Sequence, residues 1–368
     1  MKPVFKRNRM SQQVADHLLG LIRQSFKPGD KLDSERTFSE QLGVSLPTVR
    51  EALGILAEQE LIERRHGSGT YVLDPDANRH VAVLMELDIG HPRTSFFYTR
   101  LVQSVRLLLE EKGFKVRLYI GHTAPGAEFE GLTCRDFMED VQANRISGVV
   151  ALALPNFSPW DQPLVEKGIP VVGGNRFGPI FDYKSGIRTG VQRLAEAGRK
   201  RLALIGSGGP GATNVFRESL AQYGLQFEAH WVPETGGQPA APGLGWRLFR
   251  EVWSAQAVKP DGLLVLDDMI FRDAAMAMLE ADVRVPEDLL VITESNRGSF
   301  SHYPFPVIQL EYDPDAFARV YVDLLSALLR KDSVKDPHVT IPFRVVEPEA
   351  LVGAEGIKAK RGNYEDAN

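Results

Sequence analysis

The segment from residue 27 to residue 72 constrains the fold of this chain more than any other. Ser34 is a favourable helix N-cap, and Phe38 and Leu42 follow at the i, i+4 spacing that places both on one helix face. Gly43 suits the left-handed residue that often ends a helix. The spacing therefore predicts a short helix that stops at Gly43.

A second helix is expected directly after this turn. Ser45 predicts its N-cap, and Val49, Leu53 and Leu56 give it an apolar stripe. The glycine-containing turn at 66–69 then predicts a hairpin. This order is the outline of a winged helix-turn-helix, which places one helix in the major groove of DNA. The same pattern also fits a small helical domain that binds no DNA.

Five short sequence motifs in this segment are similar to those of a known family: PGDKL, SER, LGVS, TVREAL and GSGTYV. Together they resemble the DNA-binding domain of the GntR family of bacterial transcription regulators. The resemblance implies that the residues in contact with DNA are Arg36, Ser45, Leu46, Thr48, Arg50, His66 and Gly67.

The chain departs from the family at Leu46, where the family usually has Arg after the capping Ser. Loss of a base-reading guanidinium should remove roughly 1–3 kcal/mol of discrimination at one base pair. Either the operator differs from the family's common one, or Leu46 contacts a thymine methyl group.

The length and composition of the chain limit the number of domains and the way in which it can bind DNA. A chain of 368 residues is too long for one winged helix and predicts two or three domains. The net charge of −5 gives no global basic field, so DNA binding has to depend on local cations. A basic arm at the start is either a solvated terminus or a phosphate contact; it comprises Lys2, Lys6, Arg7 and Arg9.

The cysteine count and the hydropathy pattern indicate the compartment. Cys134 is the only cysteine, which excludes an intrachain disulfide and fits a reducing cytoplasm. The start has no apolar core suited to a signal peptide, and no run approaches a membrane span. A cytoplasmic protein without membrane contact is therefore expected.

Beyond a polar linker at 74–79, strand-like and helix-like segments alternate almost to the end of the chain. Such alternation predicts βαβ units and parallel sheets. One of the expected strands is Leu225–His230. The predicted class is α/β with a small N-terminal α+β domain. The predicted domains are 1–73 for DNA binding, 74–79 as linker, 80–352 as a body of two Rossmann-like lobes, and 353–368 as a polar tail.

The body carries a second resemblance, through ISGVVALAL, IPVVGGN, GVQRLAEAGRKRLALIG, FRESLAQYGL, KPDGLLVLDD, VRVPEDLLVIT and YDPDAFARV. These words resemble the effector domain of the LacI/GalR family, a fold like the type I periplasmic binding proteins. The whole arrangement is similar to AraR-like sugar repressors. It implies a homodimer on a palindromic operator, a small effector such as a sugar, and three crossings between lobes, expected near Phe177, Asn296 and Ser326.

The same resemblance implies the residues that bind the effector: Phe97, Asn175, Arg217, Asp267, Ser295 and Tyr312. An Arg fork and carboxylates can bridge vicinal hydroxyls, while an aromatic wall covers the ring of a sugar. Alternatives remain at several positions. Arg217 can be a helix surface charge, Asp267 can be a helix cap, and Phe97, like Phe96, can belong to the lobe core. The family usually has Asp at position 295, so Ser295 argues against an ordinary hexose.

A rival site is the glycine-rich loop Gly206–Gly211, which fits G-x-G-x-x-G directly after an expected strand. With Glu228 at the end of a following strand, it predicts an NAD(H)-binding redox sensor or enzyme. Pro210 removes a donor N–H where phosphate would need one. The sequence has no H-E-x-x-H, zinc-type Cys/His pairing or G-x-S-x-G elbow. A regulator with no catalytic residue, metal or cofactor is therefore the favoured reading.

Overall fold

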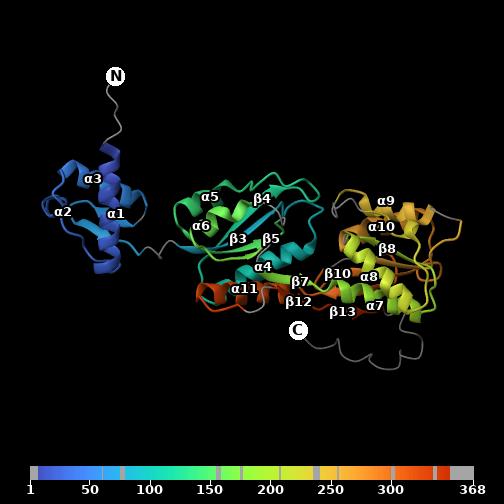
Figure 1. Ribbon diagram of the computed structural model, residues 1–368. Coiled ribbons are helices and arrows are strands. Elements are labelled where there is room, and N and C mark those ends of the chain that lie inside the picture. The colour runs from blue at the N-terminus through green and yellow to red at the C-terminus, as the bar shows by residue number, and fades with distance from the viewer. Residues whose placement is uncertain are drawn as a thin grey trace, which may run out of the picture. The chain divides into compact units, whose positions relative to one another are not determined.

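The computed structural model describes residues 7–59, 61–74, 79–154, 159–174, 177–206, 209–234, 241–254, 257–299, 303–334 and 338–348 (Figure 1). The chain forms two compact units. The first consists of Met1–His80 and Met138–Ser147, and the second of Val81–Phe137 and Gly148–Asn368. Within the described residues, no helix combines the length and the apolar character needed to cross a bilayer.

The N-terminal domain has the predicted helix-turn-helix and wing. Its elements are α1 (Arg7–Ser25), α2 (Glu35–Leu42), α3 (Leu46–Glu58), β1 (Ile62–Arg65) and β2 (Gly69–Val72). Ser34 and Ser45 cap α2 and α3, and their hydroxyls accept from the amides of Thr37 and Thr48 at 3.1 and 3.4 Å. Gly43 ends α2 in the left-handed conformation, with φ 63°. The predicted caps are confirmed.

Helix α1 was not predicted. Val14, Leu18 and Ile22 recur at i, i+4 and i+8 and are buried against the core that Phe38 and Leu53 form. The sequence had suggested only a basic arm here. Of that arm, Arg7 and Arg9 fall in the first turn of α1, whereas Lys2 and Lys6 lie outside the described residues.

The first lobe of the body is built on a four-stranded sheet with the order β4-β3-β5-β6. Its elements are β3 (His80–Leu87), α4 (Phe96–Glu111), β4 (Val116–Thr123), α5 (Arg135–Gln142), β5 (Ile146–Leu152), η1 (Pro159–Asp161), α6 (Gln162–Glu166) and β6 (Val171–Gly173). Strand β3 pairs with β4, and β5 with β6, in parallel. Helix α4 packs beside the later helix α11 (Pro314–Leu329).

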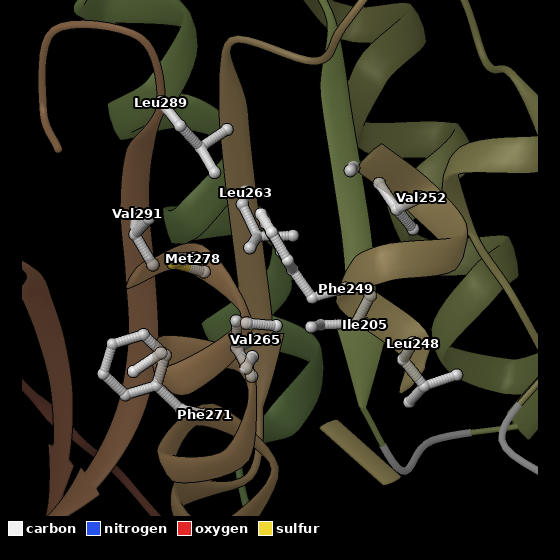
Figure 2. Packing of buried hydrophobic residues seen from close by; sticks show 14 of the residues in the cluster. Ile205, Leu248, Phe249, Val252, Leu263, Val265, Phe271, Met278, Leu289 and Val291 are labelled. Atoms are coloured by element: carbon white, nitrogen blue, oxygen red, sulfur yellow. The ribbon is translucent and has the colours of Figure 1, made fainter. Parts of the chain in front are cut away.

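The second lobe is built on a five-stranded sheet with the order β13-β11-β10-β9-β8. Its elements are α7 (Tyr183–Glu196), β8 (Leu202–Gly206), α8 (Gly209–Gln222), η2 (Ala229–Trp231), α9 (Leu244–Ser254), β9 (Gly262–Leu266), α10 (Asp268–Glu280), β10 (Leu290–Asn296), β11 (Ile308–Tyr312) and β13 (Arg344–Val346). Strands β8 to β11 pair in parallel and β13 is antiparallel. Figure 2 shows how Phe249 of α9 and Phe271 of α10 pack on one face of this sheet. Residues of α7 and α8 pack on the other.

The chain crosses between the lobes three times. One crossing lies close to its predicted position, and the other two do not. The first crossing lies between the end of β7 (Gly178–Phe181) and the start of α7 at Tyr183, a short distance beyond the expected Phe177. Asn296 instead ends β10 inside the second lobe, and the chain leaves that lobe after Tyr312. Ser326 lies within α11, where its hydroxyl donates to the carbonyl of Val322 at 2.6 Å.

The third crossing follows β12 (His338–Ile341), which pairs in parallel with β7. Strand β13 then joins the second lobe's sheet beside β11. Only Pro342 and Phe343 separate β12 from β13. Two consecutive short strands thus belong to different sheets, which periodicity alone could not indicate.

The strand expected at Leu225–His230 is absent. The segment has no strand residue and ends in the 3₁₀ turn η2. Among the described strands, β8 is therefore the edge of its sheet. Gln226 is exposed while Leu225 and Phe227 are half-buried, so the alternation that suggested a strand arises from a segment lying over the domain surface.

Candidate functional site

The predicted DNA-contacting residues lie on α2, on the first turns of α3 and on the wing. Leu46, the first residue of α3, is 38% exposed. Ser45, Arg50, His66 and Gly67 are exposed, and Thr48 is half-buried. Thr48 also shares a hydrogen bond with Ser45, at 2.8 Å between the hydroxyl oxygens.

Glu35 connects α2, α3 and the wing. Its Oε2 accepts from Arg50 Nε and Nη2 at 3.1 and 2.9 Å, and its Oε1 lies 3.4 Å from Arg64 Nη2. Arg64 also donates to the backbone carbonyl of Arg50 at 3.0 Å. The sequence indicated Arg64 as a local cation on the wing, but it did not predict the contacts of Glu35 with Arg50 and Arg64, because these contacts depend on the fold. This acid sets the position of two cations that face the same surface.

The turn of the wing leaves its backbone open to close approach by a binding partner. Ser68 N donates to the carbonyl of Arg65 at 3.0 Å, and Gly67 has φ 70°, a conformation that L side chains rarely adopt. Between the turn and the start of α2 lies a hollow of about 480 Å³, lined by Lys31, Arg64 and Arg65 among others. Arg36 is paired with Glu40 at 3.1 Å, but its side chain is 85% exposed, so the ion pair holds it weakly.

In the body, polar side chains from both lobes meet beyond the carboxyl ends of β9 and β10. Asp268 Oδ2 accepts from Ser95 Oγ and from Asn296 Nδ2, both at 2.9 Å. Asp267 Oδ1 accepts from the amide of Ile270 at 2.8 Å and caps α10. Open α/β sheets bind ligands at this end of their strands. Asp267 is thus both a helix cap and part of this group.

Burial and mutual repulsion shift the acids of this group toward their neutral forms. Burial, reinforced by the charges of Asp267 and Asp268, raises the pKa of Glu294 to about 8. Burial first and the neighbouring Asp268 second raise the pKa of Asp267. The same causes raise the pKa of the Tyr98 hydroxyl to about 12, with Asp267 and Asp268 as the charged neighbours. Within the described residues, no group of three or more His, Cys, Asp or Glu side chains is arranged to hold a metal ion.

A second contact between the lobes lies beside this group. Arg93, in the loop after β3, donates from Nη1 and Nη2 to the two carboxylate oxygens of Asp273, at 3.1 and 3.0 Å. Arg93 Nη2 also donates to the carbonyl of Ala241 at 3.1 Å. A bidentate guanidinium–carboxylate pair has a defined geometry, so it fixes the loop that carries Ser95 relative to α10.

Three of the predicted effector residues, Phe97, Arg217 and Ser295, are not brought to this group. Phe97 is 5% exposed and packs on Phe181 and Phe317, with ring centroids 5.1 Å apart in each case, so it belongs to the lobe core. Phe96, in contrast, is 37% exposed. Tyr312 is buried among the same rings, but it also adjoins the group: burial first and the charge of Glu294 second raise the pKa of its hydroxyl.

Arg217 is exposed in the middle of α8, and its guanidinium lies 4.3 Å from the centroid of the Phe227 ring. It is eight residues beyond the start of α8 at Gly209, roughly 12 Å along the helix. Ser295 is 3% exposed, and its hydroxyl has no hydrogen-bond partner among the described residues. Asn175 lies outside the described residues.

Sequence reasoning missed Arg93, Tyr98, Glu294 and Asn296 as members of this group. Glu294 and Asn296 flank Ser295, so the expected strand end was right but the side of the strand was not. Alternation along β10 places neighbouring side chains on opposite faces. Glu294 is the charged residue of β10, and its position at the polar end of this strand was the available signal.

The rival dinucleotide site is not assembled. Gly206 ends β8, and a Cβ there would lie 2.6 Å from the carbonyl oxygen of Leu266, so this glycine permits close strand packing. Glu228 lines a cavity with Lys200 and Arg201, which precede β8. The two parts of the predicted fingerprint therefore lie at opposite ends of the strand.

Comparison with known proteins matches each domain separately. Residues 10–72 match the family model described as bacterial regulatory proteins, gntR family, and residues 191–349 match the periplasmic binding protein-like domain. The mannosyl-D-glycerate transport/metabolism system repressor MngR of Escherichia coli is 39% identical over 88 residues, 24% of this chain and 34% of MngR. The chain spans about a third of the length of the curated relatives that it matches at about this identity.

Two longer matches cover both domains. The arabinose metabolism transcriptional repressor of Halalkalibacterium halodurans is 23% identical over 384 residues, covering 96% of this chain and 97% of the repressor. A solved structure described as a transcriptional regulator CelR-cellobiose complex aligns with a TM-score of 0.60 and 18% identity, covering 86% of this chain and 99% of the other. The chain joins a GntR-type helix-turn-helix domain to a periplasmic-binding-protein-like domain, an organisation shared over nearly its whole length with the arabinose repressor.

Proposed function

We propose that this protein is a cytoplasmic transcriptional repressor that binds a palindromic operator as a homodimer and responds to a small polyhydroxy effector. The observation that carries the proposal is the exposed start of α3, flanked by Arg50 and the wing at His66 and Gly67. In this geometry α3 enters the major groove and the wing follows the adjacent backbone. The residues proposed to contact DNA are Arg36, Ser45, Leu46, Thr48, Arg50, His66 and Gly67.

The effector half of the proposal rests on the group around Asp268. Carboxylates and an amide oxygen accept hydrogen bonds, and the hydroxyls of a sugar are donors that can satisfy them. Asp267, Asp268 and Asn296 are proposed to bind the effector, with Phe96 as the aromatic wall. Asn175 is retained as a predicted contact. The CelR structure, which holds cellobiose, and the arabinose repressor both favour a sugar.

Ligand and operator binding are coupled in this proposal. Ser95 and Arg93 of one lobe contact Asp268 and Asp273 of the other, so an effector that displaces either contact changes how the lobes meet. Coupling is reciprocal: an effector that weakens operator binding is itself bound more weakly when operator is present. No catalytic step is part of the proposal.

Two experiments test it. Selection of DNA from a random library with the purified protein should yield a two-fold symmetric sequence, and fluorescence anisotropy then gives its affinity. A thermal-shift panel of monosaccharides, disaccharides, sugar acids, NAD and NADH identifies the effector, since a ligand at a hundred times its Kd stabilises by about 2.7 kcal/mol. A hit should lower the affinity for the selected DNA. Recovery of no preferred sequence, or stabilisation by NADH alone, would contradict the proposal.

A further inference from the structure

The second lobe contains a cavity that the proposed function does not use. Its volume is about 590 Å³, within the range of small-molecule sites. Its walls include Lys200, Arg201, Leu225, Trp231 and Val258. Lys200 and Arg201 directly precede β8, and Val258 precedes β9, so the cavity lies at the amino ends of these strands. Asp267 and Asp268 follow the carboxyl end of β9, so they lie at the opposite ends of the strands from the cavity.

The cavity exists because residues 225–230 do not pair with β8. Gly224 ends the helical segment in the left-handed conformation, with φ 66°, and η2 then turns the chain back toward the sheet. A sixth strand at this edge would have occupied the space beside β8 with backbone. The segment passes over the surface instead and contributes Leu225, Glu228 and Trp231 as a wall.

Two residues that line this cavity each carry a buried nitrogen atom with no hydrogen-bond partner among the described residues. Trp231 is 6% exposed, and its indole Nε1 is unpartnered. The Nε2 atom of His230, whose ring meets that of Trp231 at a centroid distance of 5.0 Å, is also unpartnered. Buried polar side chains almost always find partners, and the indole N–H can only donate. Two such atoms in adjacent side chains of one cavity indicate a ligand that brings acceptors.

The charged side chains of the wall favour the same chemistry. Arg201 is fixed in place, since its Nε donates to the carbonyl of Lys259 at 2.7 Å and its Nη2 lies 3.0 Å from Asp261 Oδ2. Lys200 is exposed and has no ion-pair partner among the described residues. Glu228 is the one acid among the lining residues, and its Oε2 lies 3.8 Å from His230 Nδ1. The lining side chains that are available to a ligand are therefore mainly hydrogen-bond donors.

We propose that this cavity is a second binding site, distinct from the effector cleft, and that it takes a small organic anion. The carboxylate or phosphate of the anion accepts from Trp231 Nε1, Lys200 and Arg201. Its apolar body lies against Leu225 and Val258, of which Val258 is 60% exposed. The site depends on the second lobe alone and does not rest on the proposed function.

The indole N–H of Trp231 provides a local test. Full-length protein labelled with ¹⁵N-tryptophan should give one indole signal for each of its four tryptophans. The signal missing in Trp231→Phe identifies Trp231. Benzoate and inorganic phosphate are titrated separately at constant ionic strength, and we expect a saturable shift of the Trp231 signal with at least one. The probe that saturates at the lower concentration identifies the oxyanion.

Lys200→Gln should weaken that binding at least tenfold, whereas Lys184→Gln, an exposed lysine on α7, should leave it unchanged. Asp268→Asn should also leave it unchanged, which separates this cavity from the effector cleft. The proposal is overturned if neither probe shifts the Trp231 signal saturably. It is equally overturned if Lys200→Gln binds as the wild type does, since the shift would then reflect an adventitious ion only.

Discussion

Arg50 of α3 donates through both Nε and Nη2 to Glu35 Oε2, at 3.1 and 2.9 Å. An acid on α2 thus holds the cation that the proposed function aims at DNA. Both side chains remain partly exposed, at 62% and 29%, so the pair contributes little to folding. Its effect is on the orientation of the guanidinium, which is defined before DNA arrives.

Replacing Arg50 by Ala should weaken operator binding at least tenfold and reduce the salt dependence of binding by about one phosphate contact. Stability should change by less than about 1 kcal/mol, because the ion pair is at the surface. Anisotropy titrations at several salt concentrations measure both effects. Arg188→Ala, at an exposed position on α7, is the matched control. Equal DNA affinity of Arg50→Ala and wild type would remove α3 from the interface.

Replacing Leu46 by Arg should change which operator is preferred. Leu46 is 38% exposed at the start of α3, and an arginine there could read guanine with a bidentate contact. We expect a gain of roughly 1–3 kcal/mol for a guanine at one position of each half-site. Affinities for operators substituted singly at each position measure this, with Leu46→Met as an apolar control. An unchanged base preference would place Leu46 away from the bases.

Asp268→Asn should abolish the thermal shift given by the effector, and addition of the effector should no longer lower the operator affinity of this variant. The carboxylate accepts from Ser95 Oγ and Asn296 Nδ2, and an amide can present only one acceptor oxygen to them and to a ligand. Arg217→Ala is the comparison, because Arg217 stacks on Phe227 and does not reach this group. Its effector response should equal that of the wild type. Loss of response in Arg217→Ala alone would restore the original sequence-based assignment.

Stability should fall as the pH rises through neutrality, in part because of Glu294. Burial raises its pKa to about 8 in the folded protein, so the folded state retains a proton that the unfolded chain has lost. Between the unfolded pKa and about 8, this group therefore costs up to about 1.4 kcal/mol per pH unit. Glu294→Gln should gain stability relative to wild type over this range, measured by denaturant unfolding at pH 5.5, 6.5 and 7.5. A constant difference between the two proteins would show that Glu294 does not titrate in this interval.

The winged helix could be predicted closely because its signals are local. Ser34, Gly43 and Ser45 act within one helical turn of themselves, and the structure shows each in its predicted role. Helix α1 was missed although Val14, Leu18 and Ile22 recur at the helical spacing i, i+4 and i+8, a signal that was present in the sequence. Local chemistry specified the caps, whereas the complete core required tertiary contacts.

The effector site was less predictable because it depends on which way each side chain points. Phe96 and Phe97 are adjacent, and helix geometry exposes the first and buries the second. The predicted residue Ser295 is at the correct end of β10. However, its neighbours Glu294 and Asn296 are the residues that interact with Asp267 and Asp268. The expected strand at Leu225–His230 failed for a related reason: alternation describes burial of side chains and does not ensure that a partner edge is used.

The two-residue link between β12 and β13 leaves little torsional freedom in one of the three connections between the lobes. Ile341 is bound into one sheet and Arg344 into another, with Pro342 and Phe343 between them. The proline ring fixes its own φ near −65°, and the Phe343 ring packs on Tyr312 at a centroid distance of 5.9 Å. Few torsion angles are left to absorb a rotation of one lobe against the other. If an effector moves the lobes as proposed, we expect this link to confine the opening to a narrow set of directions.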